Sequence, residues 1–180
     1  HEAAALDANA PAPVPASPLC VHERFEQHAA AFPGATALLG DAGRLSCGEL
    51  NARANRLAHY LIAQGVGRET RVGICLPPSF ELVLAMLAVL KAGACYVPVD
   101  PDYPAARRDF VIADSGVALI LTDQALAASA LAHVDPARVL ELDERRFAAY
   151  PASNPGAGAT PANAVYVIYT SGSTGLPKGV

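Results

Sequence analysis

From residue 71 onward this chain alternates short apolar runs with helical patterns, and this alternation constrains the fold more than any other feature. Five runs are expected to be strands, at 71–76, 95–99, 117–122, 138–142 and 165–169. A strand, a helix and a second strand form a βαβ unit, and near-continuous apolar strands indicate a sheet that is covered on both faces. The sequence therefore predicts an α/β fold of βαβ units, with a mostly parallel sheet flanked by helices.

The segments between these strands are expected to form helices at 79–91, 104–115 and about 123–132. Ser79 and Asp123 are suited to cap the first turn, and Pro104 is tolerated in a first turn because its missing N–H is not needed there. Lys91 lies in the last turn of its helix, where a cation complements the helix dipole. We expect its side chain to lie in solvent.

The first half of the chain predicts a helix at 20–32, a hairpin of 35–39 with 44–46, and a longer helix to about residue 64. Ser46-Cys47-Gly48-Glu49 fits a capping box, in which the Ser46 hydroxyl accepts from the Glu49 N–H and the Glu49 carboxylate accepts from the Ser46 N–H. Gly65 is placed to end this helix.

Proline alternates with small residues over 7–18, a pattern that prevents a helix or a central strand and favours a stiff linker. We expect 1–18 to be a proline-rich interdomain linker and 19–180 to be part of one domain, cut after its terminal loop. The chain does not begin with Met, so a piece of a longer protein is expected.

Charge and composition argue against several classes of protein. The net charge is −4 without a Lys/Arg cluster, and no apolar run is long enough to span a bilayer, so neither a nucleic acid nor a membrane is an expected partner. The four cysteines form no C-x-x-C pair and the histidines do not cluster, so no metal site is expected. Cys75 and Cys95 are expected in the core, and a reducing cytoplasm is the expected setting.

The last apolar run leads directly into Thr170-Ser171-Gly172-Ser173-Thr174-Gly175-Leu176-Pro177-Lys178-Gly179. The glycines expose backbone N–H groups, and the hydroxyls and one ammonium add further donors. This combination suits the phosphates of a nucleotide. In parallel sheets ligands bind past the carboxyl ends of the strands, which is where this loop is expected.

Two commoner motifs do not fit this loop. A Walker A loop that begins at Gly172 would need Gly in place of Pro177 and Ser or Thr in place of Gly179. A nucleophile elbow centred on Ser173 would need Gly in place of Ser171. A flexible Gly/Ser linker is the remaining alternative, although linkers rarely place Pro-Lys-Gly behind such a run.

Tyr169-Thr170 followed by residues 171–179 closely resembles the phosphate-binding core motif of adenylate-forming enzymes. Residues 90–107 resemble the second core motif of nonribosomal peptide synthetase adenylation domains, and residues 45–50 resemble the first. The departures are Cys47, where the family usually has Tyr, and Ala94-Cys95, where Gly-Ala is usual. The chain thus resembles the N-terminal part of the large adenylation subdomain, and the proline-rich stretch resembles a linker from a condensation domain.

The resemblance implies a reaction in which ATP, with Mg²⁺, and an amino acid form an aminoacyl adenylate. The aminoacyl group then passes to the phosphopantetheine thiol of a carrier protein domain, during biosynthesis of a peptide secondary metabolite such as an antibiotic. The implied partners are an upstream condensation-type domain and a downstream carrier domain in the same polypeptide. The implied ATP-binding residues are Thr170, Ser171, Gly172, Ser173, Thr174, Gly175, Lys178 and Gly179, with Lys178 as the catalytic residue that steadies the pyrophosphate.

The family's specificity pocket, ribose-binding aspartate and catalytic lysine of the later motifs lie further along the chain, so the 180 residues alone are expected to be inactive. A stand-alone acyl- or aryl-acid ligase and a non-catalytic nucleotide-binding module are the alternative functions. Arg107 is expected to have a structural role, Asp100 and Asp102 to form a turn, and Tyr96 and Tyr103 to pack.

Overall fold

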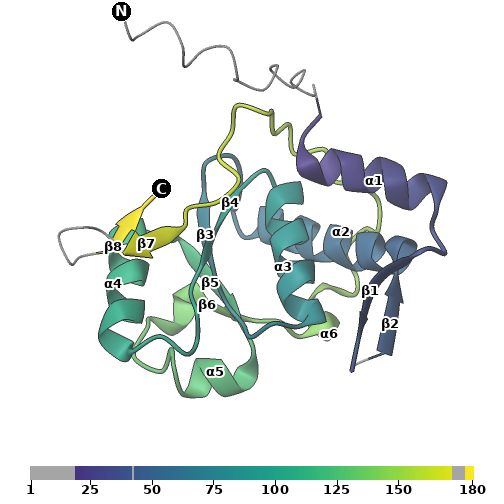
Figure 1. Cartoon of the computed structure of the whole chain (residues 1–180). Helices are drawn as coiled ribbons and strands as arrows, with labels where there is room; N and C mark the ends of the chain where they lie inside the picture. Colours follow the sequence, from purple (N-terminus) through teal and green to yellow (C-terminus); the bar gives the residue numbers. More distant parts are fainter. Residues whose placement is uncertain (1–18, 42, 172–176) are drawn as a thin grey trace, which may run out of the picture.

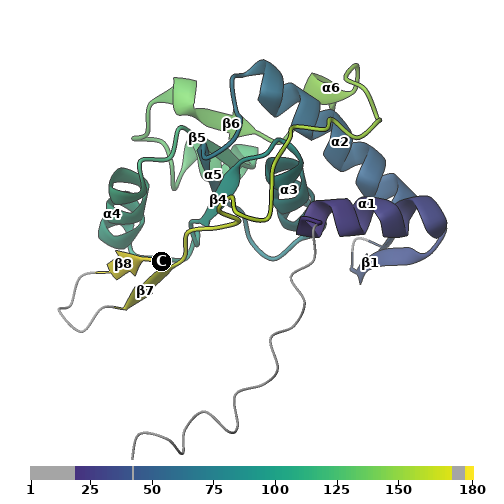
Figure 2. The same ribbon diagram turned by 90° about the horizontal axis from the view of Figure 1, so that it is seen from above.

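The computed structural model describes residues 19–41, 43–171 and 177–180 (Figure 1). The expected linker at 1–18 lies outside the described residues, so that interpretation stays a prediction. Figures 1 and 2 show a central sheet with helices on both sides and the N-terminal elements at one end.

The central sheet has four parallel strands in the order β4 (Cys95–Pro98), β3 (Arg71–Cys75), β5 (Leu119–Thr122) and β6 (Val139–Glu141). Each strand lies within one of the expected apolar runs. The predicted α/β class, with a parallel sheet and βαβ units, is therefore confirmed.

The two faces of the sheet are covered by different helices. Ile74 and Leu121 point into a core shared with α2 (Cys47–Ala63) and α3 (Phe80–Lys91). Their neighbours Cys75 and Ile120 point into a second core with α4 (Ala105–Ser115) on the opposite face. This alternation is the period of two that strands impose, and burial on both faces explains why the strands are almost continuously apolar.

The helices between the strands begin where the sequence predicts. Ser79 accepts from the N–H of Leu82, and Asp123 accepts from the N–H of Leu126. The helix that follows Asp123, α5 (Gln124–Ala128), ends four residues before the expected position. The Ser129 hydroxyl donates to the Ala125 carbonyl at 2.6 Å. A side chain that bonds a carbonyl four residues earlier competes with the backbone hydrogen bonds of the helix and weakens it.

The N-terminal third forms α1 (Val21–Ala31) and the antiparallel pair β1 (Thr36–Gly40) and β2 (Gly43–Ser46), followed by α2. The capping box is confirmed, because Glu49 accepts from the Ser46 N–H at 2.9 Å and the Glu49 N–H donates to the Ser46 hydroxyl at 3.3 Å. Helix α2 packs against both α1 and α3, so the N-terminal elements extend one face of the domain (Figure 2).

The last expected strand, 165–169, is only partly correct. Tyr166 forms a single parallel bridge with Tyr96 of β4, and Ile168 then exchanges two backbone hydrogen bonds with Val180. The chain therefore changes partner and forms an antiparallel hairpin of β7 (Tyr169–Ser171) and β8 (Pro177–Gly179). Two short elements were not expected, the 3₁₀ helix η2 (Pro136–Arg138) and α6 (Glu144–Phe147).

The cysteines are all unpaired, and Cys75 and Cys95 are buried as expected. Within the described ranges, none of the helices is both long enough and apolar enough to cross a bilayer.

Candidate functional site

The hairpin of β7 and β8 brings together two of the expected site residues. Thr170 lies directly opposite Lys178 in the antiparallel register, and both residues are exposed. Side chains at directly opposed positions lie on the same face of the pair, within about 5 Å at Cβ. A hydroxyl and an ammonium are thus presented side by side, one on each strand that borders the segment 172–176.

Gly179 is required by the packing of the hairpin. A Cβ at this position would lie 3.0 Å from Cγ1 of Val167 and 3.1 Å from Cζ of Tyr169, closer than side chains normally approach. The β8 backbone therefore lies directly over the Tyr169 ring. Packing against Tyr169 is therefore a structural reason for Gly179, which the sequence interpretation assigned only to ATP binding.

Tyr169 anchors the hairpin to α4. The residue is 8% exposed, and its ring packs edge-on against Phe110 with the centroids 6.3 Å apart. Its hydroxyl donates to the Asp114 carboxylate at 2.6 Å. Burial and this hydrogen bond raise the pKa of Tyr169 to about 12, so the phenol keeps its proton at neutral pH and acts as the donor.

The remaining expected site residues are not tested by the structure. Gly172, Ser173, Thr174 and Gly175 lie outside the described residues, and only the backbone of Ser171 is described. The position of the loop relative to the carboxyl edge of the sheet, and its contacts with phosphate, stay predictions.

The carboxyl ends of β3 and β4 do form a pocket, of about 390 Å³, but the described hairpin residues do not line it. Asp100 lies at its rim and accepts from the Asp102 N–H at 2.9 Å, which confirms the predicted turn. Arg107 stacks over the Tyr103 ring at 4.3 Å, in agreement with a structural role.

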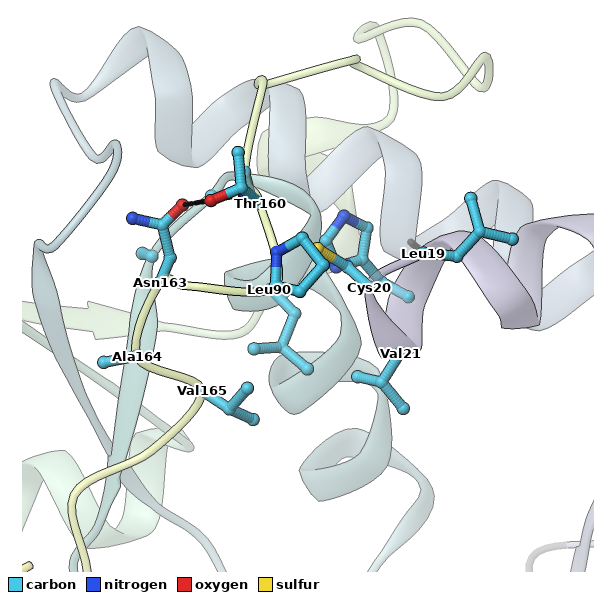
Figure 3. Close-up of a pocket in the computed structure, with 13 residues that line it drawn as sticks. Leu19, Cys20, Val21, Leu90, Thr160, Asn163, Ala164 and Val165 are labelled. Atoms are coloured by element: carbon cyan, nitrogen blue, oxygen red, sulfur yellow. Dashed lines mark hydrogen bonds between the residues drawn. The ribbon is translucent and has the colours of Figure 1, made fainter. Parts of the chain in front are cut away.

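A second pocket, of about 200 Å³, lies between the start of α1, the end of α3 and the segment 159–165 (Figure 3). Leu90, Val165 and Val21 give it a mostly apolar lining. The polar groups of Thr160 and Asn163 bond to each other at its rim, so they are not free to hold a phosphate. Neither Lys nor Arg is among the residues that line this pocket, so it offers no permanent positive charge to a phosphate.

The chain matches the AMP-binding enzyme family over residues 25–180, which include every element from α1 to β8 apart from the first residues of α1. It belongs to the AMP-binding enzyme family.

The chain is similar to several peptide synthases. It is 46% identical to a dimodular nonribosomal peptide synthase of Bacillus subtilis (strain 168) over 170 residues, with coverage of 89% of this chain and 7% of that protein. It is also 43% identical to gramicidin S synthase 2 of Brevibacillus brevis over 159 residues, with coverage of 88% of this chain and 4% of that protein.

Among solved structures, the nonribosomal peptide synthetase FmoA3 has the same fold. Its AMPPNP-bound form superposes with a TM-score of 0.81 at 30% identity, covering 96% of this chain and 18% of that one. Its α-methyl-L-serine-AMP-bound form gives a TM-score of 0.81 at 28% identity, covering 94% and 18%. The chain thus spans only a small part of the proteins that it matches.

Lys91 is the residue that the sequence interpretation placed wrongly. It is 1% exposed, and its ammonium donates to Glu26 of α1 at 2.5 Å and to the Asn154 amide oxygen at 3.4 Å. Burial lowers the pKa of Lys91, against the hydrogen bond and charge of Glu26, which raise it. The available signal was periodicity, since Lys91 follows Leu84 and Ala88 on the buried stripe of α3.

Metal ligands are not clustered in the described part of the chain, where no group of three or more His, Cys, Asp or Glu side chains could hold an ion.

Proposed function

We propose that this chain is the N-terminal part of a nonribosomal peptide synthetase adenylation domain, which activates an amino acid with ATP. The observation that carries the proposal is the exposed pair of Thr170 and Lys178 on the two strands that border a loop rich in glycine and hydroxyl groups. The 46% identity to a dimodular peptide synthase and the likeness to the AMPPNP-bound form of FmoA3 support it.

In the proposed reaction the amino acid carboxylate attacks the α-phosphorus of ATP, the bond to the β-phosphate oxygen breaks, and pyrophosphate leaves. Negative charge grows on the pyrophosphate, so catalysis depends on positioning and on neutralising that charge. Lys178 is proposed to hold the leaving pyrophosphate. We assign hydroxyl contacts with the β- and γ-phosphates to Thr170, Ser171, Ser173 and Thr174.

The glycines of the loop are assigned to a different task. Gly172, Gly175 and Gly179 would let the backbone N–H groups approach the phosphates without a side chain in between. Each charge-assisted contact of this kind contributes about 1.5–3 kcal/mol. Mg²⁺ would enter with ATP as part of the substrate.

The proposal also covers the longer protein. Residues 1–18 would be the linker from an upstream condensation-type domain, and 19–180 would be completed by a later part of the adenylation domain. The aminoacyl group of the adenylate would be transferred to the phosphopantetheine thiol of a carrier domain. We place the reaction in the cytoplasm, where ATP and reduced cysteines occur together.

Amino-acid-dependent exchange of labelled pyrophosphate into ATP by the full-length protein tests this function. The panel should contain amino acids together with aryl and fatty acids. Exchange with one or a few amino acids is expected, and exchange only with aryl or fatty acids would replace the proposal by an acid ligase. Absence of exchange with every acid would leave the non-catalytic nucleotide-binding module. The isolated 180 residues are expected to give none.

A further inference from the structure

The hairpin that carries Thr170 and Lys178 is tied to the rest of the domain by few directional contacts. Among the described residues, one side-chain hydrogen bond joins 165–180 to the remainder of the chain, from the Tyr169 hydroxyl to Asp114. Asp114 belongs to the last turn of α4, a helix that has no residue in the loop itself.

We propose that Tyr169 is a positioning residue for ATP, whose hydrogen bond to Asp114 fixes the β7–β8 hairpin on α4 and so sets where Lys178 meets the phosphates. This inference rests on the proposed function of the hairpin. It assigns to α4 a role in nucleotide binding that acts through Tyr169, without contact between α4 and the nucleotide.

The Tyr169 ring is enclosed on two sides. Phe110 of α4 meets it edge-on at an interplanar angle of 89°. On the β8 side, a Cβ added at Gly179 would lie 3.1 Å from Cζ, the ring carbon that bears the hydroxyl. Movement of the ring therefore requires movement of β8, because no space separates the two.

The register of the hairpin links the position of the Tyr169 ring to that of Thr170 and Lys178. Tyr169 faces Gly179, and the next pair along the ladder is Thr170 with Lys178. Neighbouring residues in a strand point to opposite faces, so Tyr169 points to α4 while Thr170 and Lys178 point away from it. Because the hydrogen bond to Asp114 fixes the Tyr169 ring, it also fixes the neighbouring pair of Thr170 and Lys178.

Tyr96 of β4 and Tyr166, which lies just before the hairpin, form an aromatic pair without such a bond. Tyr96 and Tyr166 lie 6.0 Å apart in a tilted arrangement, and within the described ranges neither hydroxyl has a hydrogen-bond partner. Tyr96→Phe is therefore a matched control for Tyr169→Phe. Each variant removes one phenol hydroxyl from an aromatic pair, and only Tyr169→Phe also removes a hydrogen bond.

The test compares these two variants in the full-length protein, by equilibrium binding of ATP and by pyrophosphate exchange. Tyr169→Phe is expected to weaken ATP binding about tenfold, as the loss of one hydrogen bond to a charged group implies, with a matching rise in KM for ATP. The KM for the amino acid should change by less than about twofold, because the inference concerns the phosphate loop alone. Tyr96→Phe should leave both quantities unchanged.

Variants of Asp114 test whether Tyr169 acts through this carboxylate. Asp114→Ala should weaken ATP binding as much as Tyr169→Phe, and Asp114→Asn should weaken it less because its amide oxygen can still accept. The double variant Tyr169→Phe with Asp114→Ala should be no weaker than either single variant.

The inference is overturned if Tyr169→Phe binds ATP as tightly as Tyr96→Phe, or if KM for ATP and for the amino acid rise together. It is also overturned if the unmodified protein does not bind ATP. ATP binding that depends on Tyr169 in a protein without exchange activity would support the inference and refute the proposed function, so the two failures are distinguishable.

Discussion

Two polar contacts hold two different regions of this molecule, and they differ in how deeply they are buried. The side chain of Lys91 is fully buried between α1, α3 and the loop at Asn154, and it pairs with Glu26, whose own side chain is 17% exposed. The Tyr169 hydroxyl meets Asp114 near the surface of α4 and holds a short hairpin. The first contact joins several elements of the core, whereas the second positions one candidate site.

The two regions are connected along the chain by a single irregular segment. Asn154, which accepts from Lys91 and also from Asn55 at 3.0 Å, lies near its start, and the hairpin follows its end. A site that admits ATP must remain open to solvent, so it cannot be held by a buried network of the kind around Lys91. The difference predicts that stability and nucleotide binding can be changed separately.

The largest effect is expected from Glu26→Ala, which leaves the Lys91 ammonium buried without its counter-ion. Removing one partner of a buried ion pair costs about 3–5 kcal/mol of unfolding free energy. Lys91→Met should cost less, because the remaining Glu26 side chain is 17% exposed and can be hydrated. Urea unfolding of the two variants measures this asymmetry, and equal losses would contradict it.

The unfolding free energy of Glu26→Ala is also expected to depend on pH. Without Glu26, the influences that raise the Lys91 pKa are gone, and burial lowers that pKa further below its ordinary value of 10.5. The folded state then binds fewer protons than the unfolded state in the window between the two pKa values, so the unfolding free energy rises with pH there. Between neutral pH and pH 10.5 the unfolding free energy should rise more in Glu26→Ala than in the unmodified protein. A steeper fall of the unfolding free energy in Glu26→Ala would refute the assignment of Glu26 as the partner of buried Lys91.

In contrast to the variants of Glu26 and Lys91, Lys178→Ala should have a large effect on activity and a small effect on stability. Loss of one charge-assisted contact of about 1.5–3 kcal/mol implies pyrophosphate exchange that is slower by about 10- to 100-fold. Because Lys178 is exposed, the unfolding free energy should change by less than about 0.5 kcal/mol. Lys178→Arg, which keeps the charge, should lose less activity than Lys178→Ala.

Gly179→Ala should affect the hairpin through packing. The added methyl group would press on Val167 and on the Tyr169 ring, and overpacking of this kind costs about 1–3 kcal/mol. Because the hairpin lies at the edge of the fold, this cost is expected to displace the hairpin alone. ATP binding should therefore weaken while the urea midpoint changes little. Gly34→Ala is a matched control, since a Cβ there meets nothing within 4 Å.

The smallest effect is expected from Ser46→Ala at the start of α2. It removes the side-chain half of the capping box and should cost about 1 kcal/mol of unfolding free energy. Exchange activity at saturating ATP should be unchanged, because this end of α2 is remote from the hairpin (Figure 1). A loss of ATP affinity would show that the two regions are coupled.

The sequence was sufficient for features set by local patterns. The four sheet strands, the capping box at Ser46 and the turn at Asp100 follow from apolar periodicity and from side chains that bond nearby backbone groups. These signals lie within a few residues of the structure that they predict, which is why they could be identified without knowledge of tertiary contacts.

Contacts between distant residues could not be predicted in the same way. Lys91 pairs with a residue 65 positions away, and a helix-dipole argument about its own helix does not include that partner. The change of partner after Val167 likewise depends on Val180, and the Tyr169–Asp114 bond spans 55 positions. For the site, the sequence alone predicted the residue set, and the register opposite Thr170 became visible only in the structure.

Hydrogen–deuterium exchange of the full-length protein with and without ATP tests the central claim, that the hairpin binds the phosphates of ATP, most directly. ATP is expected to slow exchange in peptides that cover 169–180 and to leave peptides that cover α1 unchanged, and Lys178→Ala is expected to weaken this protection. Protection confined to other parts of the chain, or undiminished protection of 169–180 in Lys178→Ala, would contradict it.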